Sequence, residues 1–213
     1  MRRWLSEFYR HLADPIVPWT RLALALAVVP LACAATQTLW TLHFMAPQYP
    51  QGLHLYVYPY TIVGGNGGND LPEINTLNHY VGMKKLDPDD FTDLDFIPFA
   101  MGALALLTLR VAVIGDVRAL LDLAVLTGYF GVFALGRFVY MLYNYGHSLD
   151  PHAPIRMQAF MPPILGTKQM GNFVVSSWPA AGTWLMTGFA AIVMGFAVWH
   201  TLRPRRPDRL GAG

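Results

Sequence analysis

Apolar positions along this chain gather in four long blocks instead of alternating with polar positions over short runs. The blocks cover residues 22–44, 96–114, 120–143 and 181–201. Each block has about 19 to 24 residues, enough for an α-helix to cross a bilayer core of roughly 30 Å. The pattern predicts four transmembrane helices and argues against a large soluble helical protein, whose core would show polar and apolar residues mixed at helical spacing.

The segments outside the blocks are an amphipathic stretch (1–20), two long loops (45–95 and 144–180) and a basic tail (202–213). Aromatic and leucine side chains recur at helical spacing among arginines in the first stretch, so we expect it to lie on the inner membrane surface. Because two spans separate the two long loops, both loops must lie on the same side of the membrane.

The first loop carries the signals of a short strand and a short helix. Residues 53–57 alternate between apolar and more polar side chains, which predicts a strand that ends near Pro59. A glycine-rich turn follows, and then a helix for which Asp70 and Glu73 would form a capping box. The aspartate-rich run 87–95 suits the start of a further surface helix that enters the second span.

The second loop, unlike the first, shows no helix signal, because its five prolines rule out a long helix. We expect ordered, irregular chain packed over the ends of the spans. The predicted fold class is therefore an all-α integral membrane protein, with four transmembrane helices and a capping outer domain built from two long loops. The prolines are Pro151, Pro154, Pro162, Pro163 and Pro179.

Composition and charge agree with this interpretation and orient it. Hydrophobic residues make up 54% of the chain and charged residues 13%, whereas a soluble domain has about 25% charged residues. Arginines gather before the first block, between the second and third, and after the fourth, while the long loops hold only four basic residues. By the positive-inside rule both termini are cytoplasmic and the long loops face outward. The basic residues form no patch with interleaved aromatics, so we expect no nucleic-acid partner.

Two interpretations of the first block stay open. Ala32-Cys33-Ala34 resembles the cleavage site of a signal peptide. We favour a retained anchor because the apolar run continues through Leu39, Trp40 and Leu42. Cys33 is the only cysteine, so an intrachain disulfide is excluded and a metal site must use other side chains.

The two loops hold side chains that suit a soft metal. Cu(I) prefers thioether and imidazole ligands. Asn75, His79 and Met83 follow one another at helical spacing and form a stripe, and Met157 and Met161 share the same four-residue spacing. The alternative is that these methionines fill helical faces. The predicted copper ligands are His79, Met83, His147, Met157 and Met161, with Met45, His54, His152 and Met170 on the same side of the membrane.

Sites within the spans are the less favoured alternatives. His43, late in the first span, and His147, just beyond the third, would be the axial pair of a b-type haem. Arg110, Asp122 and Arg137 place charge inside predicted spans, where it is expensive and often functional. We expect these three to pair structurally, with Arg137 reaching a loop carboxylate, rather than to form a proton path.

Several segments of both loops resemble a small four-span bacterial membrane protein family. This NosB-like family is associated with gene clusters for nitrous oxide respiration of the Sec-exported type. The glycine-rich turn at 64–68 is longer than the resemblance leads us to expect. The segments that carry the resemblance are Ala46–Leu53, Glu73–Met83, Tyr143–His147, Leu149–Pro151, Pro162–Gln169 and Asn172–Phe173.

The resemblance implies an accessory factor of a periplasmic copper-dependent respiratory system in the bacterial inner membrane, which assists copper loading or docking. It supplies no catalytic residues, and the GxGxxG, P-loop and HExxH motifs are absent from the sequence, so we expect no enzymatic activity. We expect the lipid bilayer and other protein subunits as partners. Two alternatives are a non-catalytic structural subunit of a respiratory or photosynthetic complex and a haem- or quinone-bearing electron carrier.

Overall fold

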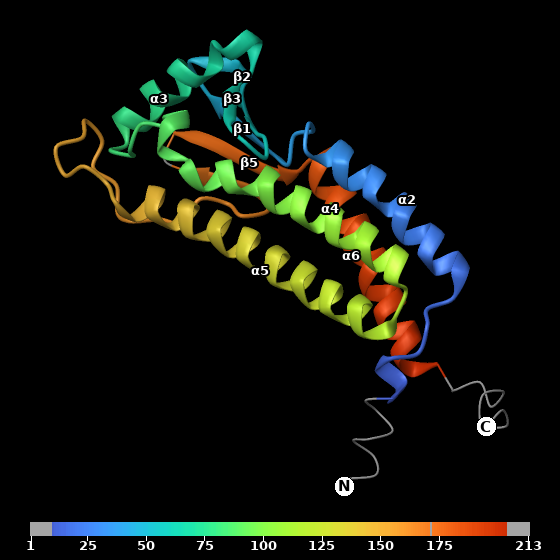
Figure 1. Ribbon diagram of the computed structural model, residues 1–213. Helices are drawn as coiled ribbons and strands as arrows, with labels where there is room; N and C mark the ends of the chain where they lie inside the picture. Colours follow the sequence, from blue (N-terminus) through green and yellow to red (C-terminus); the bar gives the residue numbers. More distant parts are fainter. Residues whose placement is uncertain (1–9, 171, 204–213) are drawn as a thin grey trace, which may run out of the picture.

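The computed structural model describes residues 10–170 and 172–203. Residues 1–9 of the predicted amphipathic segment, and Arg205, Arg206 and Arg209 of the basic tail, lie outside the described residues. The chain forms a bundle of long helices with a β-sheet at one end, and both described termini lie at the other end (Figure 1). His11 Nε2 lies 3.0 Å from the carbonyl oxygen of His200, which brings the two described ends together.

Four helices pack side by side in the described part of the bundle. They are α2 (Pro18–Ala34), α4 (Phe96–Ile114), α5 (Val117–His147) and α6 (Ala181–Leu202). Helix α2 packs against α4 and α6, and α5 packs against α4 and α6. Leu24 and Leu31 of α2 lie in the buried core between the helices, so this helix is an integral part of the bundle.

Three of these helices, α4, α5 and α6, are long and apolar enough to cross a membrane. The prediction of four such spans is wrong, because α2 has only 17 residues. At 1.5 Å per residue it rises about 26 Å, less than the roughly 30 Å hydrocarbon core. The bounds predicted for the last three spans agree closely with α4, α5 and α6, although α5 extends a further turn beyond Tyr143.

The all-α prediction is also wrong, because the two loops build a five-stranded antiparallel sheet. Its order is β3-β2-β1-β5-β4. The central strand β1 comes from the predicted first span and β5 from the second loop, so the two loops lie on the same end of the bundle. The strands are β1 (Trp40–Ala46), β2 (Tyr49–Val57), β3 (Ile62–Gly64), β4 (Gly166–Met170) and β5 (Phe173–Pro179).

The prediction of the first span was wrong because its second half alternates with the period of a strand. Helix α2 ends at Ala34, and in β1 the side chains of Leu42, Phe44 and Ala46 are buried in alternation with less buried neighbours. A period of two is typical of a half-buried strand. Because residues 40–46 are mostly apolar, the sequence of this strand resembles the continuation of an apolar helix. The continuing apolar run therefore does not argue for a retained anchor, and retention of the first segment stays a prediction.

The first loop keeps its predicted strand and helix but not the predicted cap. Strand β2 and helix α3 (Asp70–Tyr80) confirm both elements. The N-cap position of α3 is Asn69, without a side-chain capping bond, and the Asp70 carboxylate instead accepts a hydrogen bond from the backbone N–H of His54, 2.9 Å away. The run 87–95 forms two short 3₁₀ turns rather than a surface helix, and a further turn precedes α3. These turns are η1 (Asn66–Gly68), η2 (Pro88–Asp90) and η3 (Thr92–Asp95).

The sheet has its own hydrophobic core, separate from that of the bundle. One face of the sheet packs against α3 and the last turn of α5 around Leu55, Ile74, Tyr145 and Val175. Helix α5 reaches this core because its 31 residues rise about 46 Å, well beyond the hydrocarbon thickness. One continuous helix therefore ties the sheet to the bundle (Figure 1).

Candidate functional site

The predicted stripe through Asn75, His79 and Met83 does not form. Helix α3 ends at Tyr80, and Gly82 follows with a φ of 79°, a left-handed conformation that redirects the chain. His79 is exposed at the end of the helix, whereas Met83 packs against the core beneath the sheet. The Asn75 side chain bonds the backbone of Leu86 instead of a metal, with Nδ2 donating to its carbonyl at 2.9 Å.

The other three predicted ligands lie at two different depths. His147, at the end of α5, is exposed and stacks on the ring of Tyr143 with a centroid distance of 3.8 Å. Met157 packs against the core beneath the sheet, and Met161 is half-buried in irregular chain nearby in sequence. The structure thus brings Met83 and Met157 to one core and leaves the two histidines at the surface, so ligation by all five stays a prediction.

A pair of histidines on the opposite face of the sheet was not foreseen. His43 of β1 and His54 of β2 are register partners, and their rings stack with centroids 4.4 Å apart. His43 Nε2 is buried without a hydrogen-bond partner and lies over Gly52, where a Cβ would come within 1.9 Å of it. Burial, and then the neighbouring charge of His54, hold the pKa of His43 below its usual value.

Placement of His43 in a strand removes it from the late first span where the haem interpretation put it. Its neighbour His54 has Asp70 nearby, with Nδ1 3.9 Å from the carboxylate. Within residues 10–170 and 172–203, however, no group of three or more histidine, cysteine or carboxylate side chains is arranged to hold a metal ion.

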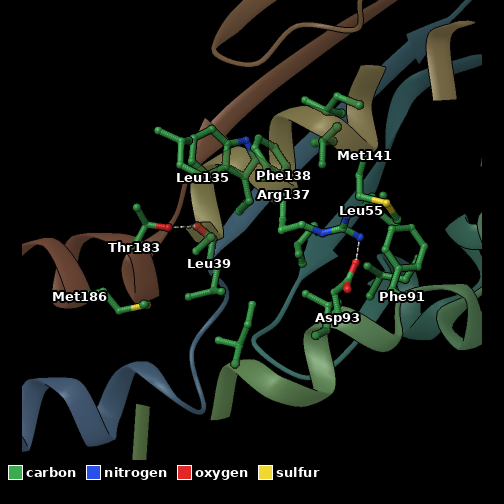
Figure 2. A pocket seen from close by; sticks show the side chains of 18 of the residues that line it. Leu39, Leu55, Phe91, Asp93, Leu135, Arg137, Phe138, Met141, Thr183 and Met186 are labelled. Atoms are coloured by element: carbon green, nitrogen blue, oxygen red, sulfur yellow. Dashed lines mark hydrogen bonds and ion pairs between the residues drawn. The ribbon is translucent and has the colours of Figure 1, made fainter. Parts of the chain in front are cut away.

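A cavity of about 430 Å³ lies where the bundle meets the sheet. Its walls combine residues of both cores, from Leu31 and Phe189 of the bundle to Leu55 and Val175 of the sheet. The long wall is α5, which has buried residues from Val117 to Thr127 and again at Tyr145 and Gly146, but none between. Figure 2 shows Phe138 and Met141 of α5 at this cavity, with Met186 of α6 across from them. Apolar side chains line nearly all of it.

One ion pair supplies the charge at this cavity. Arg137 of α5 donates from Nη2 to the carboxylate of Asp93 in η3 (Figure 2). Its Nε is buried without a hydrogen-bond partner, and its guanidinium lies 5.1 Å from the centroid of the Tyr140 ring. Arg137 pairs with a loop carboxylate, as expected. Arg110 and Asp122 are exposed, and no ion pair of either is found among the described residues.

Sequence reasoning missed the histidine pair and the cavity for different reasons. The alternation in 40–46 was the available signal for β1, and it lay hidden inside an apolar block. The cavity had no local signal, because its lining comes from segments between Leu31 and Ala190 that meet only in the fold.

No family model matches this chain, and no curated protein matches it.

Proposed function

We propose that this is an accessory membrane protein of a periplasmic copper-dependent respiratory system, such as nitrous oxide reduction, and that it assists copper loading or docking of the copper enzyme. The resemblance of both loops to the NosB-like family supports the system. The observation that carries the role is the face of the sheet that neither α3 nor α5 covers.

This uncovered sheet face is defined by the strand register. Alternate residues of β1, β2 and β5 point away from the core beneath the sheet. Met45 is 46% exposed and Trp178 is 52% exposed, and they lie at opposite ends of this face, so large side chains are available to a partner along its length. The residues of the face are Thr41, His43, Met45, His54, Tyr56, Val174, Ser176 and Trp178.

The chemistry of this face fits a copper protein as the partner. The strand register brings His43, Met45 and His54 together on this face. Their imidazole and thioether groups are the ligand types that Cu(I) prefers. The predicted ligands His79 and His147 are exposed at the same end of the molecule. An enzyme docked on this face would meet His43, Met45 and His54, whereas His79 and His147 lie on α3 and α5, which cover the other face.

The proposed location is the bacterial inner membrane, with the sheet in the periplasm. Three apolar helices are compatible with embedding in a membrane. The described termini meet at the end away from the sheet. The described arginines Arg10, Arg21, Arg118 and Arg203 belong to the segments at that end, which the positive-inside rule assigns to the cytoplasm.

Copper binding is tested on the full chain purified in detergent. We expect stoichiometric Cu(I) in competition with a chromophoric chelator, and loss of that copper in the double variant Met45→Leu/His54→Ala, which removes two of the three soft ligands of the uncovered face. The matched control is His152→Ala, whose side chain is 91% exposed and which keeps the copper. A chain that binds no copper contradicts the loading role.

Docking is tested by co-purification of the exported copper enzyme with the full chain. We expect Trp178→Ser to reduce capture while Trp184→Ser, an exposed tryptophan on α6, leaves it unchanged. Co-purification of large membrane subunits instead, without copper, favours the structural-subunit alternative. A Soret band in the purified protein favours the haem-bearing carrier.

A further inference from the structure

We propose that the cavity between bundle and sheet binds a neutral membrane amphiphile of the isoprenoid quinone class. The head group lies at Arg137 and the chain lies along the apolar wall of α5. This proposal does not depend on the copper role of the protein, because it rests on residues of a different site.

The size and lining of the cavity fit a small-molecule ligand rather than a packing defect. Its volume of about 430 Å³ lies within the range of roughly 300–1,000 Å³ that ligand pockets occupy. A void that large and lined by apolar side chains costs the fold stability when it is empty. Phe130, Ala134 and Phe138 recur every four residues on α5 and line it. Phe130 also packs against the bundle core and Phe138 against Trp40, so this stripe forms a structured apolar wall that a ligand can contact.

The polar end of the cavity selects a neutral head group with acceptor oxygens. Arg137 carries one positive charge, but Asp93 neutralises it. An anionic head group would therefore meet the Asp93 carboxylate as well as the guanidinium. What remains is the Nε–H of Arg137, a buried donor without a partner, which is expensive to leave unsatisfied. A quinone carbonyl carries no charge and accepts such a bond.

Aromatic side chains and the amide of Asn78 complete the head-group region. Trp40, Phe91 and Tyr145 line the cavity, and flat rings stack on aromatic side chains. Asn78 is 2% exposed and lines the same space, which provides a second polar contact. This combination of aromatic walls with few polar groups suits a planar ring better than a phosphate ester.

The depth of the site suits a ligand held in a bilayer. From Val117 to Arg137, α5 rises about 30 Å, which equals the hydrocarbon thickness. Arg137 then lies at the head-group level and Phe130 within the hydrocarbon. Phe133 and Leu135 line the cavity and are also 62% and 54% exposed. The cavity therefore opens sideways along α5, where an isoprenoid chain can pass into the lipid.

The first test is the identity of the molecule that co-purifies with the full chain in mild detergent. Solvent extracts are analysed by mass spectrometry, and we expect a quinone at near one per protein. An extract with phospholipid or fatty acid at that stoichiometry and no quinone overturns the proposal.

The second test measures affinity for a short-chain quinone in lipid nanodiscs through quenching of tryptophan fluorescence. Ala134→Trp fills the cavity and should abolish binding, whereas Val132→Trp, on the lipid-exposed face of the same helix, should not. Arg137→Lys keeps a charge beside Asp93 but lacks the Nε–H. It should weaken binding by about 10- to 150-fold, the loss expected for one hydrogen bond to a charged group.

Each variant is accepted only if its thermal unfolding matches that of the wild type. If Ala134→Trp does not fold, Arg137→Lys decides the question. Equal affinities in the wild type and in a folded Arg137→Lys or Ala134→Trp variant overturn the proposal.

Discussion

Substitution of Asn75 by alanine should loosen the segment that connects α3 to the bundle. The Asn75 side chain donates from Nδ2 to the Leu86 carbonyl at 2.9 Å and accepts from the Leu86 N–H at 2.6 Å. Leu86 is buried, so alanine would leave both of its backbone polar groups without partners. At about 0.5–1.5 kcal/mol for each bond, plus part of the cost of the unsatisfied groups, the loss is about 2–3 kcal/mol.

The assay is thermal unfolding of the full chain in detergent, combined with hydrogen exchange. For a chain of this size each kcal/mol shifts the midpoint by about 2–4 °C, so we expect Asn75→Ala to unfold about 4–12 °C earlier. Asn75→Asp keeps the acceptor for the Leu86 N–H and should preserve protection of that amide, while still losing stability through the lost donor. The control Thr76→Ala removes only an exposed hydroxyl that bonds the Pro72 carbonyl and should change stability by less than about 0.5 kcal/mol. If Asn75→Ala unfolds at the wild-type temperature with the Leu86 amide still protected, the two bonds do not hold this segment.

Two further perturbations test the packing of the sheet end. In Gly146→Ala the new Cβ would lie 1.9 Å from the Phe160 carbonyl oxygen, so the unfolding midpoint should fall by the equivalent of about 1–3 kcal/mol. The control is Gly136→Ala on the same helix, where a new Cβ meets nothing within 4 Å. A comparable loss of stability in Gly136→Ala would contradict the steric explanation. Burial lowers the pKa of His43 below its usual 6.5, so the folded state disfavours protonation: stability should be full above about pH 6.5 and should fall as the pH drops below it. Unfolding scans from pH 8 to pH 5 should show this loss in full in the wild type and in His152→Gln and a smaller loss in His43→Gln. Equal losses in the wild type and in His43→Gln would refute the assignment to His43.

Several local elements were predictable because their signals are local. The alternation in 53–57 predicted β2, and the helix after Asp70 exists as α3. The capping box failed because the backbone N–H of His54 takes the Asp70 carboxylate. A tertiary bond outcompeted a local one, and nothing in the sequence near Asp70 indicates that competition.

Strands β4 and β5 were not predicted, because prolines nearby suggested irregular chain throughout the second loop. Residues 173–178 hold β-branched and aromatic side chains, which was a usable signal. Their pairing with β1 was not predictable, since β1 itself lay inside an apolar block. Length and mean apolarity do not separate a transmembrane helix from a shorter helix followed by a half-buried strand.

The sequence by itself determined that this chain is rich in membrane-length helices, and it placed α4, α5 and α6 closely, because a long run of apolar residues has few other stable arrangements. Only the tertiary structure decided that residues 40–46 form a strand, that His43 meets His54, and that α5 leaves a cavity beside Arg137. These features depend on contacts between residues far apart in the chain. Periodicity reports which face of an element is apolar, but it does not report which partner, if any, covers that face.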